Sequence, residues 1–465
     1  MAPAKPSENV RVLVRVRPFV RREVERDDEE VVKTVGERSV QVINGVTANG
    51  RGQTGTAYQF DKCFGNDTTQ DELFKQSGVT GLLDHVLEGY SATVFAYGPT
   101  GSGKTYTITG KPDNINKNGS GDSSDGLVIR SIESLFGKIR DLTGEGRQFK
   151  VRGSCVEIYN ESVVDLINYS KSSGGRGEKS HLPVRFDPSR GAFFVSDLTY
   201  GKCLAEEDML RLYMRALRNR TVASHELNRD SSRSHALFTI YVDSMVQDEG
   251  GGIVTRHGKI TFVDLAGSER LKASKSEGTT LKETGAINKS IFTLGKVISS
   301  LCDRRKRDPV PYRDSKLTQL LMDSIGGTSL TLMLACVSPA LSYLPESVRT
   351  LDYASRAKNI KNKPVVLLDE QQGIISELKR ELEALRNENK ALRDALNSSA
   401  RASMSSAMSA PEHDSEAMDP SPLGVGSAVR HSIGSFTQGG YPGGGRGSPG
   451  GWDAPREPRS HGPSP

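Results

Sequence analysis

The sequence predicts an α/β domain in which a twisted, mostly parallel sheet is covered by helices on both faces. First, short apolar and β-branched runs alternate with segments of helical periodicity, as in sheets whose strands are joined by helices. Second, one of these runs, residues 92–97, leads directly into a glycine-rich turn. Third, another apolar run, residues 259–263, ends in an acid, Asp264. Functional groups at the ends of strands are typical of this class of fold.

The individual elements follow from the spacing of the apolar residues. Strands are expected where β-branched and aromatic residues cluster, and helices where apolar residues recur every three or four positions. The expected strands are residues 10–16, 92–97, 154–159, 236–242 and 259–263, and the expected helices are residues 73–87, 104–109, 132–139 and 280–301. Polar stretches at 110–126 and 170–180 are expected to be surface loops, and the first is interpreted as mobile.

The turn after residues 92–97 has the spacing G-x-x-x-x-G-K-T, which predicts a phosphate-binding loop. Small residues let successive backbone N–H groups surround a β-phosphate, while Lys104 reaches the β- and γ-oxygens and the Thr105 hydroxyl binds magnesium. The alternative is a glycine-rich β-turn with a chance lysine, but the buried strand before the turn is the context that the motif requires. The predicted nucleotide-binding residues here are Gly98, Pro99, Thr100, Gly101, Ser102, Gly103, Lys104 and Thr105.

Composition bounds the cellular setting. The 465 residues are 35% hydrophobic and 26% charged, and the net charge of +5 is too small to identify a partner. The five cysteines are far apart, which favours reduced thiols in an intracellular protein. No run of 18 apolar residues exists and the first residues lack a signal-peptide core, so a cytoplasmic location without membrane insertion is expected.

Two further polar segments border apolar strands. Residues 228–235, with the sequence NRDSSRSH, precede the strand at 236–242, although serines and asparagine favour an ordinary loop there as well. Asp264 begins the sequence DLAGSER at the end of another strand, where an acid can hold a magnesium-bound water. The N–H group of the nearby Gly267 can contact a γ-phosphate.

Six motifs follow one another along the chain: YGPTGSGKT at 97–105, NRDSSRSH at 228–235, DLAGSER at 264–270, INKS at 287–290, VPYRDSKLT at 310–318 and YASRAK at 353–358. In this order they make residues 9–360 resemble the kinesin motor domain. Any one of them alone is a weak signal, but the ordered set excludes coincidence. The resemblance implies the fold of a P-loop NTPase, ATP and Mg²⁺ as ligands, and microtubules as the partner.

The resemblance also places the adenine base and the first switch segment. Arg15, Arg17 and Pro18 match the adenine-side motif of the family, and Tyr106 would close the other face of the base. Residues 228–235 are similar to switch I, in which Ser232 would join Thr105 around Mg²⁺ and Arg233 would approach the γ-phosphate. The nucleotide-binding positions that match in this segment include Asn228 and Ser231.

Residues 264–270 are similar to the second switch segment of the family. There Asp264 would bind Mg²⁺ through water, Gly267 would donate to the γ-phosphate, and Glu269 would pair with Arg233. If that pair forms only when both segments close, only then does Glu269 accept a proton from the attacking water, through a second water. The predicted catalytic residues are therefore Ser232, Arg233, Gly267 and Glu269.

A basic surface follows the second switch segment. Between residues 280 and 301, lysines at intervals of seven lie opposite an apolar stripe, which alone would also suit a solvated face. A run of four basic residues comes next, and the resemblance makes this region the microtubule face. Nucleic acid is the competing partner, but no nucleic-acid module or interleaved aromatic residues support it. The predicted microtubule-binding residues are Lys282, Lys289, Lys296, Arg304, Arg305, Lys306, Arg307, Arg313 and Lys316.

The remaining sequence divides into short segments around the motor-like domain. Residues 1–9 form a leader, 10–360 the motor domain, 361–370 a stretch resembling the kinesin neck linker, 371–397 a coiled-coil neck, and 398–465 a disordered Ser/Gly/Pro-rich tail. In the neck, apolar residues at alternating steps of three and four and Asn389 at an a position predict a parallel homodimer. A single amphipathic helix that packs on the motor is the alternative.

Two positions depart from the family pattern with expected consequences. Pro99 stands where the family usually has Gln, and a proline removes one backbone donor from the loop, so altered nucleotide affinity or turnover is expected. Leu367 stands where many relatives have an asparagine that latches the docked neck linker, so weaker or different docking is expected.

The resemblance therefore implies an ATP-driven microtubule motor on the cytoskeleton. A motor domain that precedes its neck linker usually moves toward the plus end in this family, so the resemblance also implies plus-end direction. One alternative is a non-motile microtubule-binding ATPase that regulates filament ends. Another is a signalling GTPase, but the chain lacks the Asn/Thr-Lys-x-Asp guanine signature at the expected later strand.

Overall fold

The computed structural model describes residues 9–46, 53–111, 122–169, 181–226, 231–247, 253–269, 279–303, 309–368 and 370–407. The chain divides into two compact units, residues 1–387 and 388–465. All described strands lie in the first unit, and the described part of the second is helical.

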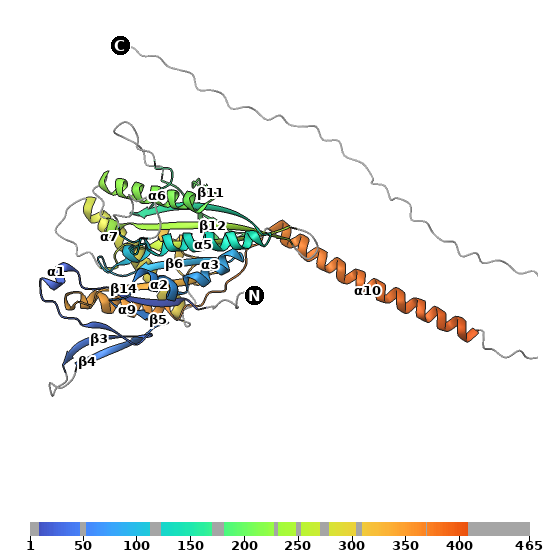
Figure 1. Ribbon diagram of the computed structural model, residues 1–465, viewed down its shortest axis with the longest axis horizontal. Coiled ribbons are helices and arrows are strands. Elements are labelled where there is room, and N and C mark those ends of the chain that lie inside the picture. Colours follow the sequence, from blue (N-terminus) through green and yellow to red (C-terminus); the bar gives the residue numbers. More distant parts are fainter. Residues whose placement is uncertain are drawn as a thin grey trace, which may run out of the picture. The chain divides into compact units, whose positions relative to one another are not determined.

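A nine-stranded sheet is the centre of the first unit (Figure 1). Its strand order is β11-β7-β12-β13-β6-β14-β1-β5, and β8 pairs with β7 outside this path. The strands are β1 (Arg11–Val16), β5 (Lys62–Phe64), β6 (Ser91–Tyr97), β7 (Gln148–Tyr159), β8 (Ser162–Asp165), β11 (Gly201–Cys203), β12 (His235–Gln247), β13 (Ile253–Asp264) and β14 (Leu330–Val337).

The sheet is parallel from β13 through β6, β14 and β1 to β5, and antiparallel from β13 to β11. Antiparallel pairing arises where consecutive strands are joined by short connections, such as β7 to β8 and β12 to β13, since a parallel pair needs a longer crossover. The parallel half carries the phosphate-binding loop, which follows β6. The predicted α/β class is therefore confirmed.

Helices cover both faces, and each face has its own apolar core (Figure 1). One core contains residues of α2 (Gln70–Ser77), α3 (Val79–Leu87), α5 (Leu127–Gly144) and α6 (Glu206–Glu226). The other contains residues of α7 (Thr279–Cys302), α8 (Lys316–Leu320) and α9 (Leu344–Ala357). Strand β6 supplies alternate side chains to both, with Val94 in the first core and Phe95 in the second, as the two-residue repeat of a strand requires.

The helix expected over residues 73–87 is in fact two helices, α2 and α3, that meet at Gly78. Gly78 has a left-handed backbone with φ of 84°, and a Cβ atom there would overlap the guanidinium group of Arg11. Apolar periodicity gave no sign of the break, because Leu73 before it and Leu83 after it face the same core.

Smaller elements surround the sheet. They are helices α1 (Arg21–Val24) and α4 (Lys104–Ile108), a three-stranded sheet of β2 (Val32–Val35), β3 (Ser39–Val46) and β4 (Gln53–Gln59), and a hairpin of β9 (Val184–Asp187) and β10 (Ala192–Val195). The last described element is the helix α10 (Glu370–Ala407).

The predicted tail boundary at residue 398 is too early, because α10 continues to Ala407. Alanine, methionine and arginine within 400–407 favour a helix, and the next proline is Pro411. The rest of the predicted tail, residues 408–465, lies outside the described residues.

Candidate functional site

The phosphate-binding loop lies between β6 and α4. Gly98, Gly101 and Gly103 all have positive φ, and a Cβ atom on Gly98 would overlap the carbonyl oxygen of Cys336 on β14. These positions need glycine for conformation, and Gly98 needs it for space as well. The loop is therefore shaped by its backbone, as a phosphate cradle requires.

Lys104 is buried at the start of α4, where its Nζ donates a hydrogen bond of 2.9 Å to the carbonyl oxygen of Pro99. Burial lowers the pKa of Lys104, and the negative charge of Asp264 opposes that shift. Pro99 removes an N–H group from the loop, but its carbonyl holds the lysine within it. The loop thus keeps a buried amine at the predicted phosphate position.

A hydroxyl and a carboxylate meet beside the loop. The Thr105 Oγ1 donates to Asp264 Oδ2 at 2.8 Å, which joins α4 to the end of β13. The other oxygen of Asp264, Oδ1, is buried and accepts no hydrogen bond from the described residues. Oxygen atoms of this kind are the ligands that Mg²⁺ prefers, and an unpaired buried oxygen suits a bound water of that ion. The residues present therefore fit the Mg²⁺ that the sequence motif predicts.

Arg220 on α6 completes this cluster, and sequence reasoning missed it. Its Nη1 donates to Asp264 Oδ2 at 2.9 Å, and its Nε lies 3.8 Å from Glu157 Oε1 on β7. Burial favours a lower pKa for Arg220, but the charges of Asp264 and Glu157 outweigh it and raise that pKa. The available signal was Glu157 itself, a single acid within an apolar strand, which calls for a buried cation.

The two switch-like segments lie against each other. The Gly267 N–H donates to the Ser232 carbonyl oxygen at 2.9 Å, and the Ser268 N–H donates to the Gly98 carbonyl oxygen at 3.0 Å. Ser232 belongs to the 3₁₀ turn Ser231–Arg233, and Ser234 alone separates this turn from β12. The structure thus brings the loop 98–105 together with both predicted segments, whereas Asn228 lies outside the described residues.

Glu269 has a different partner from the one that the resemblance implied. One of its oxygens accepts a 2.8 Å hydrogen bond from the Thr100 N–H, and the other accepts from the Thr100 hydroxyl. The structure therefore holds Glu269 on the phosphate-binding loop and not on Arg233. The Arg233–Glu269 pair stays a prediction for the arrangement in which both segments have closed.

Arg15 and Arg17 are buried and bound to protein groups. Arg15 donates to Gln70 and Thr107 and lies 5.3 Å from the ring centre of Tyr106, while Arg17 donates to the carbonyl oxygen of Gly101 at 2.7 Å and forms an ion pair with Glu23. Burial lowers the pKa of Arg15. Both arginines therefore brace the loop and α4.

The other two adenine-side residues have open surfaces. Pro18 is exposed, and Tyr106 has 38% of its surface exposed. These two residues present apolar surface at the predicted base position, and their contact with adenine stays a prediction.

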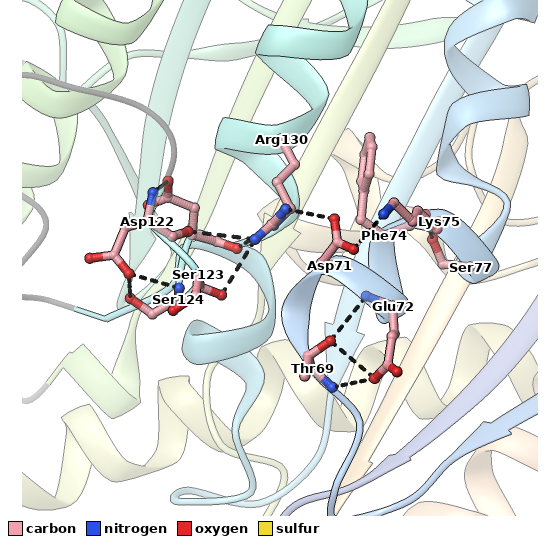
Figure 2. A network of polar contacts seen from close by, with 11 residues as sticks. Thr69, Asp71, Glu72, Phe74, Lys75, Ser77, Asp122, Ser123, Ser124 and Arg130 are labelled. Atoms are coloured by element: carbon pink, nitrogen blue, oxygen red, sulfur yellow. Dashed lines mark hydrogen bonds and ion pairs between the residues drawn. The ribbon is translucent and has the colours of Figure 1, made fainter.

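A polar network holds the end of the loop 110–126, the loop interpreted as mobile from its sequence, where the chain enters α5 (Figure 2). Arg130 on α5 donates to Asp71 on α2 at 3.2 Å and to the carbonyl oxygen of Ser123 at 3.3 Å. Gln70 directly precedes Asp71 on α2, and its Nε2 donates to the Tyr106 carbonyl oxygen at 2.6 Å. The end of the loop is therefore fixed beside the nucleotide site, while residues 112–121 lie outside the described residues.

The described basic residues occupy adjoining elements on the α7 side of the sheet. Lys289 and Lys296 are exposed on α7, where Lys296 lies 4.8 Å from the ring centre of Phe292. Arg313 is exposed just before α8, and the N–H of Lys316 donates to Glu161 at 2.8 Å, which fixes the start of α8. The side chain of Lys282 and the run Arg304, Arg305, Lys306 and Arg307 lie outside what the structure describes.

The segment resembling the neck linker runs along the core. The Leu367 N–H donates to the Gly89 carbonyl oxygen at 3.0 Å, and its carbonyl oxygen accepts from the His257 N–H at 2.8 Å. At the start of the segment, Asn362 donates to the carbonyl oxygens of Ser324 and Ser329. Leucine at position 367 is therefore compatible with docking, because both of its hydrogen bonds use the backbone.

Among the described residues, no helix combines the length and the apolar character needed to cross a bilayer.

Known proteins share this arrangement over most of the chain. Residues 15–360 match the family model of the kinesin motor domain. The chain is 40% identical over 377 residues to the chromosome-associated kinesin KIF4 of Mus musculus, in an alignment that covers 81% of this chain and 29% of that protein. It is 39% identical over 393 residues to the kinesin-like protein KIF13A of Homo sapiens, covering 82% of this chain and 21% of that protein.

A solved structure described as that of a fast kinesin resembles the chain with a TM-score of 0.68 at 32% identity, covering 78% of this chain and 95% of that one. The chain thus spans less than a third of the length of the two curated relatives, but nearly all of the solved domain. With the phosphate-binding loop and both switch segments assembled as described, the chain belongs to the kinesin motor domain family.

Proposed function

We propose that this chain is a motor that hydrolyses ATP and is stimulated by microtubules. One observation carries the proposal: the N–H of Gly267 bonds to Ser232 within a site where Thr105 bonds to Asp264. These contacts bring both switch segments to the loop, which supports a role for them in sensing a terminal phosphate bound there. The kinesin family assignment also argues against the signalling GTPase.

The chain's own residues have separate tasks in this proposal. Lys104 neutralises charge on the β- and γ-phosphates, and the Gly267 N–H donates to the γ-phosphate. Thr105, Ser232 and, through water, Asp264 would hold Mg²⁺, which stabilises charge on the phosphates when bound. Closure of the segments moves Glu269 from Thr100 to Arg233, where the carboxylate accepts the proton of the attacking water through a second water.

Microtubules are the proposed partner of the exposed basic residues on α7 and α8. Lys289 and Lys296 point away from the core that Leu294 and Val297 enter, so both ammonium groups are available to an acidic surface. Such contacts steer association and weaken as salt screens them.

Replacing Lys289 and Lys296 together with alanine is expected to raise the Kd for microtubules about fivefold at low salt, the loss of two exposed ion pairs worth roughly 0.5 kcal/mol each. The difference from the unmodified chain should shrink at high salt. Cosedimentation at two salt concentrations measures it. Arg215→Ala is the control, because Arg215 is exposed on α6, which covers the opposite face of the sheet. An equal loss of affinity in both variants would contradict the assignment of this face.

Docking of residues 361–368 is the proposed output of the motor, and Leu367 offers a direct test. Leu367→Pro removes the N–H that bonds to Gly89, while an extended Val366 stays compatible with the proline. Gliding velocity is expected to fall severalfold, because the lost backbone hydrogen bond stabilises docking by roughly 1 kcal/mol. Microtubule-stimulated ATP turnover should stay within about twofold of the unmodified chain. Leu367→Ala keeps the N–H and should glide like the unmodified chain. Normal gliding of the proline variant would exclude a role of docking in movement.

We also propose plus-end direction and a parallel homodimer through residues 371–397. Exposed leucines of α10 support the dimer, because they follow the a/d repeat. They are Leu378, Leu382, Leu385, Leu392 and Leu396. Gliding of polarity-marked microtubules tests motility and direction together. Binding and ATP turnover without movement would favour the non-motile regulator of filament ends.

A further inference from the structure

His235 lies between α7 and the loop 264–267, which begins at the end of β13. It is the first residue of β12 and is 2% exposed. Its Nδ1 accepts a hydrogen bond of 2.9 Å from the Ala266 N–H, and its Nε2 lies 2.7 Å from the Ser290 Oγ on α7. One side chain thus contacts the loop that follows β13 and the helix that carries the exposed lysines.

The hydrogen bonds define the state of the imidazole ring. A backbone N–H can only donate, so Nδ1 is the unprotonated acceptor and Nε2 carries the proton that is donated to Ser290. Burial, aided by the nearby Arg220 cation, lowers the pKa of His235 to about 3. The ring therefore stays neutral at physiological pH and keeps this single tautomer.

The residues at the two ends of this link have functional neighbours. Ala266 precedes Gly267, whose N–H is the proposed γ-phosphate donor. Ser290 is buried, but it follows the exposed Lys289, a proposed microtubule contact. A shift of α7 that moved the Ser290 hydroxyl would displace the imidazole or break its hydrogen bond to Ser290. The imidazole in turn binds the backbone N–H of Ala266, the residue before Gly267.

We propose that His235 is a positioning residue that couples microtubule binding at α7 to the loop 264–267. The inference rests on the proposed function, because it explains how an event on the track reaches the phosphate site. A planar ring with both nitrogens engaged fixes the distance between its two partners, which a flexible or purely apolar side chain would not do. Coupling between two sites is reciprocal, so ATP should alter microtubule affinity through the same residue.

Two variants break the α7 side of the link in different ways. Ser290→Ala removes only the hydroxyl. His235→Asn can keep an acceptor near the position of Nδ1 for the Ala266 N–H, but its short side chain cannot reach Ser290. Ser299→Ala is the matched control, because Ser299 is an exposed serine on the same helix.

The test is steady-state ATP turnover with and without microtubules. Ser290→Ala should keep basal kcat and basal KM within about twofold, while the ratio of stimulated to basal kcat falls about tenfold, a typical size for coupling between sites. His235→Asn should lower that ratio similarly, and the double variant should be no worse than either single one, because one link is lost only once. Ser299→Ala should behave like the unmodified chain.

The outcomes separate the inference from the function on which it rests. Normal stimulation of Ser290→Ala, or losses that multiply in the double variant, would overturn the coupling role of His235 and leave the motor proposal standing. An unmodified chain that microtubules do not stimulate would overturn both. A purely structural role of His235 would lower the melting temperature and basal turnover together, without a change in the ratio.

Discussion

Replacing Glu269 with alanine is expected to lower microtubule-stimulated ATP turnover about a hundredfold or more, the scale for loss of one group that acts in the transition state. ATP affinity should change little, because the loop 98–105 and Lys104 hold the phosphates. In the structure the Glu269 carboxylate accepts from the N–H and hydroxyl of Thr100, so the variant removes one acceptor of Thr100 but keeps Lys104 and the glycines of the loop.

Single-turnover kinetics with a fluorescent ATP analogue separate binding from hydrolysis in this variant. Arg233→Ala should reproduce its phenotype, since the two side chains are proposed to act as one pair. Glu145→Ala, an exposed acid at the end of α5, provides the control. Turnover like that of the unmodified chain in either site variant would refute the catalytic assignment.

Arg220→Met is expected to lower the free energy of unfolding by about 3–5 kcal/mol, the cost of leaving buried charges unpaired. Arg220 is 8% exposed and lies between the buried carboxylates Asp264 and Glu157, and methionine fills similar space without a charge. Loss of the guanidinium also leaves Thr105 as the one hydrogen-bond donor to Asp264 Oδ2 among the described residues. The affinity for Mg²⁺ should therefore change together with the free energy of unfolding.

Urea denaturation at neutral pH measures the stability change. Arg215→Met is a matched control on the same helix, because Arg215 is exposed and its replacement should cost less than about 0.5 kcal/mol. Equal stability of the two variants would mean that the buried cation does not balance the two carboxylates.

Much of the site was predictable because its signals are local in the sequence. The spacing from Gly98 to Thr105 determines a loop geometry by itself, and a strand before it can be read from a single buried run. Asp264 was predictable for the same reason, since its place at the end of an apolar strand puts it at one edge of the sheet. The motif order then supplied the family, which the comparisons confirm.

What the sequence could not show depends on contacts between distant segments. Arg220 is one of several arginines on α6, and only the packing of α6 on β7 and β13 selects it as the buried cation. His235 ends a polar octet, and nothing local indicates that its ring reaches Ser290. The break at Gly78 was missed because apolar periodicity continues across it.

The most direct test is ATP turnover of the purified chain as polymerised tubulin is added, at low salt and with Mg²⁺. We expect α7 to promote closure of the segments 231–235 and 264–269 when microtubules bind. The kcat should therefore rise with microtubule concentration to a plateau more than about tenfold above the basal value, which corresponds to a barrier lowered by at least about 1.4 kcal/mol. A rate that polymerised tubulin leaves unchanged would contradict the link between the basic face and the phosphate site.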